Sequence, residues 1–134
     1  MAGYSGTPLP KKLGIKEGSR YALCGAPTGF SAVLGGLPAG AALCAAGDGN
    51  LDVLVFFTTD RGALEKSFNG LANSLATRGG LWIAWPKRAS KVPTDITEDV
   101  LREVILPNGW VDNKVCAIDE VWSGLRFVRR KENR

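Results

Sequence analysis

Two short, continuously apolar runs separated by an amphipathic segment constrain the fold most strongly. Residues 51–57 (LDVLVFF) and 81–85 (LWIAW) are too short for typical helices and are typical of strands covered on both faces. Between them, from Asp60 to about Thr77, we predict a helix, because apolar side chains recur at spacings of four, three and four: Leu64, Phe68, Leu71 and Leu75. A buried strand, a crossover helix and a second buried strand form a parallel unit, so the sequence predicts a layered α/β domain.

The remaining elements continue this alternation of strands and helices. Further helices are predicted over 8–13, 30–34 and 95–106, and further strands over 21–24, 41–45, 110–118 and 122–130. Helix boundaries are expected at Thr7, at Asp95 with Glu98, and at Arg78-Gly79-Gly80. The tight connection Asp119-Glu120-Val121 makes the last two strands an antiparallel hairpin.

Strand 41–45 is the weakest element, because only a short loop separates it from strand 51–57. A parallel crossover normally needs about a dozen residues or more, so we expect this strand to be very short or antiparallel. The predicted fold is a three-layer, Rossmann-like, mostly parallel sheet of about six strands that ends in an antiparallel hairpin.

Chain length and cysteine usage favour one reduced domain. The 134 residues fit a single domain, 1–134, with a basic C-terminal end at 126–134. The three cysteines, Cys24, Cys44 and Cys116, lie in apolar runs without CxxC spacing, which favours buried thiols and a cytoplasmic protein. The N-terminal segment lacks the pattern of a signal peptide, and no apolar run has the length of a membrane span, so we expect no membrane association.

The basic charge is concentrated at one end of the chain. Residues 126–134 carry five basic side chains and one acidic one, which accounts for the net charge of +4. We interpret this end as a solvated tail, and nucleic acid is disfavoured as a partner. A weaker hypothesis is phosphate or nucleic-acid binding through Lys87, Arg88, Lys91 and the tail. A monomer is expected, because arginines flank the final strand, which we place at the sheet edge.

Residues 13–30 combine a strand with a glycine-containing turn, Gly25-Ala26-Pro27-Thr28-Gly29, a layout that aims backbone N–H groups at a ligand. The order of short helix, LGIKEG, apolar strand and GxxxG resembles the opening of class I methyltransferases. Asp52 at the head of a buried strand, Gly79-Gly80 before the next strand and the closing hairpin match that family in order. The resemblance implies a methyltransferase-like fold and an S-adenosylmethionine site at the turn.

A second resemblance spans the whole chain. The phrases YSGTPLPKKLGIK, LWIAWPKRASKVPTDITEDV and VCAIDEVWSGLRFVRR are similar to a bacterial family described as a domain of unknown function. That resemblance implies a relative and no activity.

Three positions depart from the methyltransferase pattern. Leu23 stands where the family has a carboxylate, Pro27 replaces the middle glycine, and the acidic residue after the second strand is missing unless Asp48 takes its place. Two absent charge-assisted hydrogen bonds, each worth about 1.5–3 kcal/mol, would weaken the cofactor by orders of magnitude. The leading hypothesis is therefore a non-catalytic binding or interaction module with a degenerate cofactor site and no cofactor. The alternative is a divergent methyltransferase that uses Asp48, Asp60 or Trp85 for an altered cofactor pose.

Ligands of open α/β sheets bind beyond the carboxyl ends of the parallel strands. The candidate ligand-binding residues at that edge are Gly25, Pro27, Thr28, Thr58, Asp60, Trp85, Lys87, Arg88, Asp119, Glu120 and Trp122. They would suit a small anionic or aromatic ligand, or a protein partner, with Lys87 and Arg88 as charge partners and either indole as a stacking wall.

Each candidate also has a structural interpretation. Thr59 or Asp60 can cap the following helix, Trp85 can complete the core, and Asp119-Glu120 can form a solvated turn. The sequence contains no histidine, which excludes Ser-His-Asp and Cys-His catalysis and histidine-containing zinc sites. Only the Asp119-Glu120 pair or a perturbed Lys87 remains for acid-base work, so we assign no catalytic residue and no metal site, and a non-enzyme is favoured.

Overall fold

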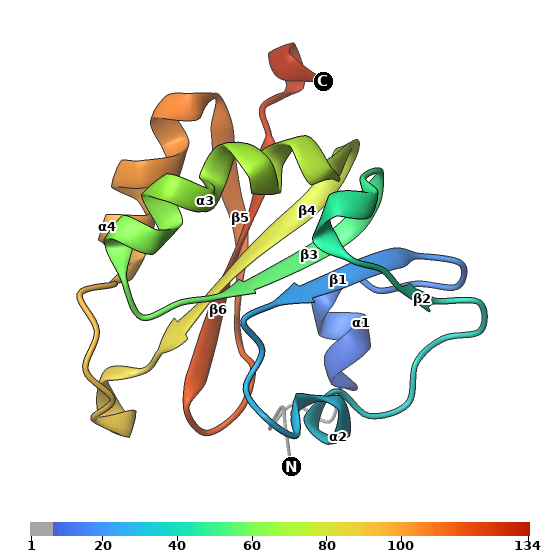
Figure 1. The fold of residues 1–134 in the computed structure, drawn as a ribbon, viewed down its shortest axis with the longest axis horizontal. Helices are drawn as coiled ribbons and strands as arrows, with labels where there is room; N and C mark the ends of the chain where they lie inside the picture. Colours follow the sequence, from blue (N-terminus) through green and yellow to red (C-terminus); the bar gives the residue numbers. More distant parts are fainter. Residues whose placement is uncertain (1–6) are drawn as a thin grey trace.

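The computed structural model describes residues 7–134, which form a six-stranded mixed sheet in the order β2-β1-β3-β4-β6-β5. The strands are β1 (Arg20–Cys24), β2 (Ala42–Leu43), β3 (Leu51–Phe57), β4 (Leu75–Pro86), β5 (Trp110–Ala117) and β6 (Trp122–Arg129). Strands β1 to β4 are parallel to one another, and β6 is antiparallel to both β4 and β5. The predicted six-stranded, mostly parallel sheet with a terminal hairpin is confirmed (Figure 1).

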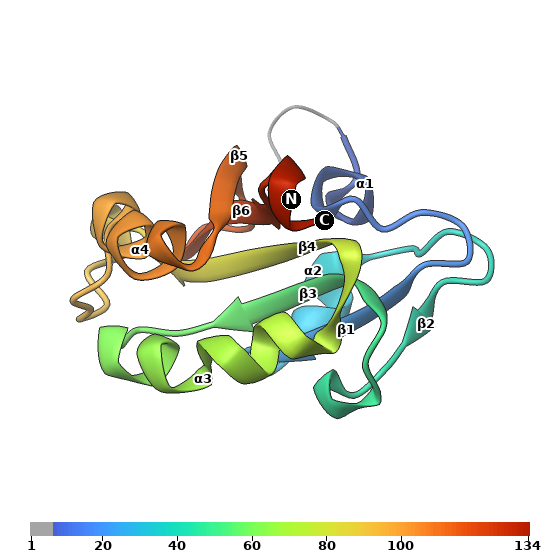
Figure 2. The ribbon, with the colours of Figure 1, turned by 90° about the horizontal axis from the view of Figure 1, so that it is seen from above.

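Helices cover both faces of the sheet. They are α1 (Leu9–Leu13), α2 (Phe30–Leu34), α3 (Arg61–Ser74) and α4 (Glu98–Ile105), with short 3-10 turns η1 (Ala46–Asp48), η2 (Arg88–Ser90), η3 (Leu106–Asn108) and η4 (Lys131–Asn133). Figure 2 shows α3 on one side of the sheet and α1 on the other. The apolar side chains of α3 and α4 pack in one core layer, and those of α1 and α2 pack in a second layer on the opposite face. None of the helices in residues 7–134 is long and apolar enough to cross a membrane.

The second strand is parallel and has only two residues, which explains how a short connection can follow it. Leu43 of β2 and Val53 of β3 both pair with Tyr21 of β1, so they lie at the same level of the sheet. Strand β3 begins two residues before Val53, at Leu51, so the connection has to go back along the strand direction by the length of only about two residues. The η1 turn completes this return on the face covered by α3.

Helix α3 ends earlier than the sequence predicts, at Ser74 and not near Thr77. Leu75, placed by its spacing in the apolar stripe, has an extended backbone and pairs with Leu51 as the first residue of β4. The predicted stop at Arg78-Gly79-Gly80 is therefore wrong, because these residues belong to a strand of 12 residues. Pairing with β3, a tertiary contact, overrides the helical periodicity.

Two predicted helix caps are also wrong. Helix α4 begins at Glu98 and not at Asp95, since the Thr97 hydroxyl accepts a hydrogen bond from the Val100 N–H at 3.2 Å. The Asp95 carboxylate instead accepts from the Arg61 N–H at 2.8 Å, which ties the loop before α4 to the start of α3. Helix α1 has Pro8 at its N-cap position with no side-chain cap, so Thr7 does not cap it.

The final strand lies inside the sheet and not at its edge. Strand β6 pairs with β4 on one side and β5 on the other, so β5 forms the edge, with Val115 58% exposed. The argument for a monomer from arginines at an edge strand therefore fails, and the monomer stays a prediction.

The C-terminal arginines are partly structural and do not form a solvated tail. The Arg129 guanidinium donates to the carbonyls of Ala72, Ala76 and Thr77 at 2.7, 3.0 and 3.3 Å, and it lies 4.7 Å from the centre of the Trp110 ring. Arg126 is half-buried in β6.

Candidate functional site at the carboxyl edge of the sheet

The predicted segments meet at the carboxyl edge of the sheet. Strands β1, β3 and β4 run parallel and end at Cys24, Phe57 and Pro86. The turn between β5 and β6 reaches the same edge, because Trp122 pairs with Pro86. The sheet topology thus assembles the glycine turn, the Thr58–Asp60 segment, the segment after β4 and the β5-β6 turn, as the sequence predicts.

The glycine turn after β1 lies against the backbone at the end of β3. Gly25 has a φ of 70°, and a Cβ atom there would lie 2.9 Å from the Phe57 carbonyl oxygen, so only glycine fits this turn. The Phe30 N–H donates to the Pro27 carbonyl at 3.1 Å as the chain enters α2, while Thr28 is exposed. Burial raises the pKa of the neighbouring Cys24 thiol, which makes it a poor nucleophile at neutral pH.

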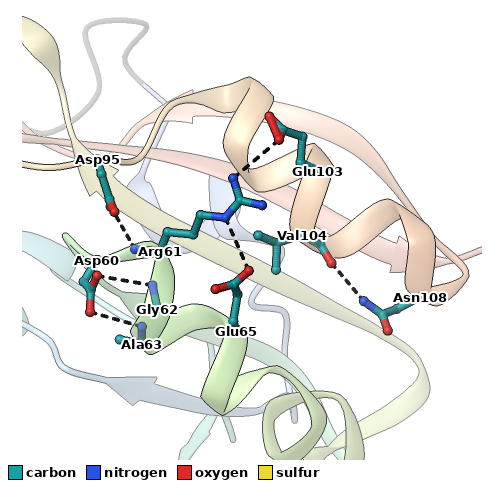
Figure 3. Close-up of polar contacts among 9 residues, drawn as sticks. All are labelled: Asp60, Arg61, Gly62, Ala63, Glu65, Asp95, Glu103, Val104 and Asn108. Carbon is teal, nitrogen blue, oxygen red and sulfur yellow. Dashed lines mark hydrogen bonds and ion pairs between the residues drawn. The ribbon is translucent and has the colours of Figure 1, made fainter.

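Thr58 and Asp60 form a helix cap at the end of β3. The Thr58 hydroxyl is buried and accepts from the Asp60 N–H at 3.1 Å. The Asp60 carboxylate accepts from the N–H groups of Gly62 and Ala63, both at 3.2 Å (Figure 3). Asp60 therefore caps α3, in agreement with the structural interpretation of this residue.

We predict that Asp60→Ala lowers the free energy of unfolding by about 1 kcal/mol, within a range of roughly 0.5–2 kcal/mol, because two N–H groups lose their partner. Urea unfolding followed by circular dichroism measures this change. Asp60→Asn is the matched control, since its side-chain oxygen can still accept and should retain most of the stability. Equal losses in the two variants would show that the carboxylate charge, and not the cap, stabilises α3.

A second cluster fixes the β5-β6 turn to the end of β4. The Lys87 ammonium donates to the Asp119 carbonyl at 2.6 Å, and the Lys87 N–H donates to the Val121 carbonyl at 2.7 Å. The Asp119 carboxylate accepts from the N–H groups of Val121 and Trp122, each at 2.8 Å. Lys87 and Asp119 thus close a turn, whereas Glu120 and Arg88 are exposed.

The two candidate tryptophans lie on opposite faces of the sheet. Trp122 packs edge-on against Phe57, with ring centres 5.2 Å apart, in the layer of α1 and α2. Trp85 is 8% exposed and packs in the layer of α3 and α4. Each indole can therefore act as a stacking wall only on its own face, and the predicted edge divides into two separate regions.

A cavity of about 580 Å³ lies beside Trp85, under the loop between β4 and α4. Its lining includes Arg88, Lys91, Thr94, Thr97, Glu98 and Ser123. Lys91 has a φ of 61°, which is unusual for a residue other than glycine. Sequence reasoning missed Thr94, Thr97 and Glu98 because a helix start at Asp95 hides the length of this loop, and it missed Ser123 because only the pairing of β6 with β4 brings that residue to the cavity. Thr97 is the residue in the sequence that could have placed the start of α4 correctly, because threonine is a preferred N-cap residue.

Asp48 does not take the place of the missing acidic residue after β2. Its carboxylate accepts from the Ala45 N–H at 2.9 Å and closes η1. The adjacent Gly49 carbonyl accepts from Arg20, the first residue of β1, at 3.2 Å. Asp48 thus lies near the amino end of β1, about 16 Å of strand from the glycine turn.

Within residues 7–134, no group of three or more His, Cys, Asp or Glu side chains could hold a metal ion. Comparisons with protein-family profiles and with curated protein sequences give no match.

Several solved structures share the fold over most of the chain. A SAM-dependent methyltransferase from Aquifex aeolicus is 14% identical, with a TM-score of 0.59 over 87% of this chain and 85% of its own. Aeropyrum pernix fibrillarin, solved with natively bound S-adenosyl-L-methionine, is 15% identical, with a TM-score of 0.54 over 95% of this chain and 71% of its own. A ribosomal protein L11 methylase from Lactobacillus delbrueckii subsp. bulgaricus is 14% identical, with a TM-score of 0.55 over 84% and 70% of the two chains. At these identities the likeness shows the fold alone, a Rossmann-like α/β fold similar to that of these methyltransferases.

Proposed function

We propose that this chain is a divergent methyltransferase domain that binds S-adenosylmethionine, or a related adenosyl compound, at the carboxyl edge between β1 and β3. One observation carries the proposal. Strands β1 and β3 are neighbours, but the helices that follow them, α2 and α3, cover opposite faces of the sheet. Such a switch point opens a crevice at the carboxyl ends of the strands, where open α/β sheets bind their ligands.

The likeness to S-adenosylmethionine-dependent enzymes supports this choice of ligand class. The glycine turn after β1 stands at the switch point, and Gly25 presses against Phe57 of β3. Gly29, at the start of α2, has open space where a Cβ atom would lie. A ligand can therefore approach the backbone of this turn closely.

The backbone of the glycine turn suits the adenosyl cofactor, whereas the side chains around the turn fit it only in part. Leu23 is a half-buried apolar residue where a carboxylate would be expected, and Pro27 supplies no N–H. Asp48 lies at the other end of β1, as described above. A micromolar site that loses two charge-assisted hydrogen bonds falls to a dissociation constant of about 0.2 mM or weaker.

When bound, S-adenosylmethionine supplies an activated methyl group for transfer to a nucleophile. The chain's own contribution would be to orient that group through the turn at 25–29 and to accept a proton from the acceptor molecule. Since the sequence has no histidine, an exposed carboxylate is a suitable group to take this proton. Asp60 and Glu120 are exposed carboxylates at this edge.

An NMR titration with S-adenosylmethionine up to several millimolar tests the proposal. We expect saturable shifts at the backbone amides of Gly25, Ala26, Thr28 and Gly29 and of Thr58. Pro27→Gly, which restores an N–H in the turn, should tighten binding by a few fold, as expected for one added hydrogen bond. Pro93→Gly, a proline in another loop, is the matched control and should leave the affinity unchanged. Absence of any saturable shift at these amides would contradict the proposal.

A second candidate function is non-catalytic binding of a small anionic or aromatic ligand in the cavity beside Trp85. The observation that favours it is the combination of an indole with Arg88 and Lys91 around one cavity of about 580 Å³. Titration with an aromatic carboxylate such as benzoate separates the two candidates. This second function predicts shifts at Lys91 and Thr94 and none in the glycine turn.

A further inference from the structure

A second cavity lies at the amino edge of the sheet, opposite the carboxyl edge. It has a volume of about 370 Å³ and is lined by the loop between α1 and β1, the start of β4 and the middle of β6. Three cations line it, Lys16, Arg78 and Arg126, together with the carboxylates of Glu17 and Asp52. The role proposed for the carboxyl edge leaves this cavity unused.

Arg126 is a half-buried guanidinium without a carboxylate partner in the described part of the chain. The ion pairs among residues 7–134 involve only Arg61 and Arg102 as cations. The described side-chain hydrogen bond of Arg126 goes to the neutral Asn113 amide oxygen at 3.3 Å. Burial lowers its pKa, and so does the nearby positive charge of Arg134. The fold therefore holds a cation in an unfavourable position, and an anion beside it would offset that cost.

The position of this guanidinium is fixed by Gly80 of β4. A Cβ atom on Gly80 would lie 2.5 Å from Nε and 2.8 Å from Cζ of Arg126, so the planar group lies over the glycine backbone. Glycine at this position leaves the space that the guanidinium occupies. The charged group is thus positioned by the sheet and is not free to move as an exposed arginine would.

The opposite wall, the Gly14–Ser19 loop, is held by its own hydrogen bonds. The Lys16 N–H donates to the Ser19 hydroxyl at 2.9 Å, and the Gly18 N–H donates to the Ala39 carbonyl at 3.0 Å. At the loop's start, the Leu13 carbonyl accepts from the buried Trp82 indole at 2.9 Å. The loop therefore presents Lys16 to the cavity from a constrained backbone.

The carboxylates do not cancel the positive charge. The Asp52 carboxylate accepts from the Arg20 backbone N–H at 2.8 Å, and Glu17 is exposed. Three cations face two carboxylates, and the charge of Arg134 is added to that of Arg126. The cavity thus has an excess of positive charge and a planar guanidinium, which suits recognition of a tetrahedral oxyanion.

We propose that this amino-edge cavity is a phosphate-binding site that takes a small phosphate or pyrophosphate group between Arg126, Arg78 and Lys16. The site is independent of the function proposed for the carboxyl edge and lies outside the loop cluster Lys87, Arg88 and Lys91.

Isothermal titration with inorganic pyrophosphate and with inorganic phosphate, at ionic strength held constant with NaCl, tests this proposal. We expect saturable binding of at least one of the two, with NMR shifts at the amides of Gly14, Gly18 and Gly79. Arg126→Gln should weaken binding by about tenfold or more, because a charge-assisted hydrogen bond is lost. The matched control is Lys66→Gln, which removes an exposed cation of α3 that lines neither cavity and should retain the wild-type affinity.

Lys16→Gln is a second variant that avoids the core, since Lys16 is exposed, and it should weaken binding by several fold. If Arg126→Gln does not fold, the affinity of Lys16→Gln for pyrophosphate and phosphate tests the proposal. Equal affinity in the wild type, Lys16→Gln and any folded Arg126→Gln would overturn the proposal, as would a loss confined to Lys66→Gln. Binding of S-adenosylmethionine is expected to be the same in all these variants, so the two proposals can fail separately.

Discussion

Replacement of Trp82 by alanine is expected to lower the free energy of unfolding by about 4–5 kcal/mol, the upper part of the range for a large aromatic side chain in a core. Trp82 is fully buried in the middle of β4 and packs in the layer of α1 and α2. Its indole N–H also donates to the Leu13 carbonyl at 2.9 Å, across 69 positions of sequence. The substitution therefore creates a cavity and leaves a carbonyl at the end of α1 without its partner.

Chemical denaturation followed by fluorescence of the remaining tryptophans measures this change. Trp82→Phe helps to separate the two causes, because it keeps an aromatic ring in the core while it removes the donor and part of the ring volume, and it should cost about 1–3 kcal/mol. Val115→Ala is the matched surface control. Its side chain is 58% exposed on the edge strand β5, so its effect should stay within about 0.5 kcal/mol. A Trp82→Ala loss as small as this control would mean that the layer of α1 and α2 is not packed as described.

The second large effect is expected for Arg129→Ala, with a loss of about 2–4 kcal/mol in the free energy of unfolding. The guanidinium satisfies carbonyls at the end of α3 and the start of β4, and it also lies over the Trp110 ring. Hydrogen bonds to a charged group contribute about 1.5–3 kcal/mol, and a cation-π contact adds about 0.5–1 kcal/mol. Without Arg129, nothing in the described structure replaces this donor at the end of the helix.

Thermal and urea unfolding of Arg129→Ala and Arg129→Lys tests this role. The lysine variant keeps the charge but not the planar fork of donors, so it should recover only part of the lost stability. Lys131→Ala, which removes an exposed cation two positions later, is the control and should change stability by less than about 0.5 kcal/mol. If Arg129→Ala behaves like Lys131→Ala, the C-terminal arginines are a solvated tail after all.

Local patterns were sufficient to predict much of the fold. Strand 51–57 and helix 30–34 have the predicted bounds, because a continuous apolar run and a helix bounded by glycines depend on neighbouring residues alone. The end of α3 could not be predicted in this way. Leu75 fits the helical stripe, yet its pairing with Leu51 and the cap from Arg129 come from distant parts of the chain.

The candidate site likewise combines features that the sequence predicts with features that depend on distant contacts. The residue order places the glycine turn, Asp60, Lys87 and Asp119 at one edge, because parallel strands bring their carboxyl ends together. The sequence does not show that the carboxylates of Asp60 and Asp119 each bind two backbone N–H groups. It also cannot show that Trp85 and Trp122 face opposite layers, since that depends on the register of β4 with β6.

The alternation of strands and helices, the terminal hairpin and the glycine turn after β1 could all be predicted from the residue pattern. Each of these follows from hydrophobic period and turn chemistry, which act over a few residues. Three features depend on contacts between distant parts of the chain: β6 lies inside the sheet, Arg129 caps α3, and Arg126 lies over Gly80 beside a cavity. The physical reason is that charged side chains near the chain end are indistinguishable in sequence. Their burial and their hydrogen-bond partners are set by strands and helices far along the chain.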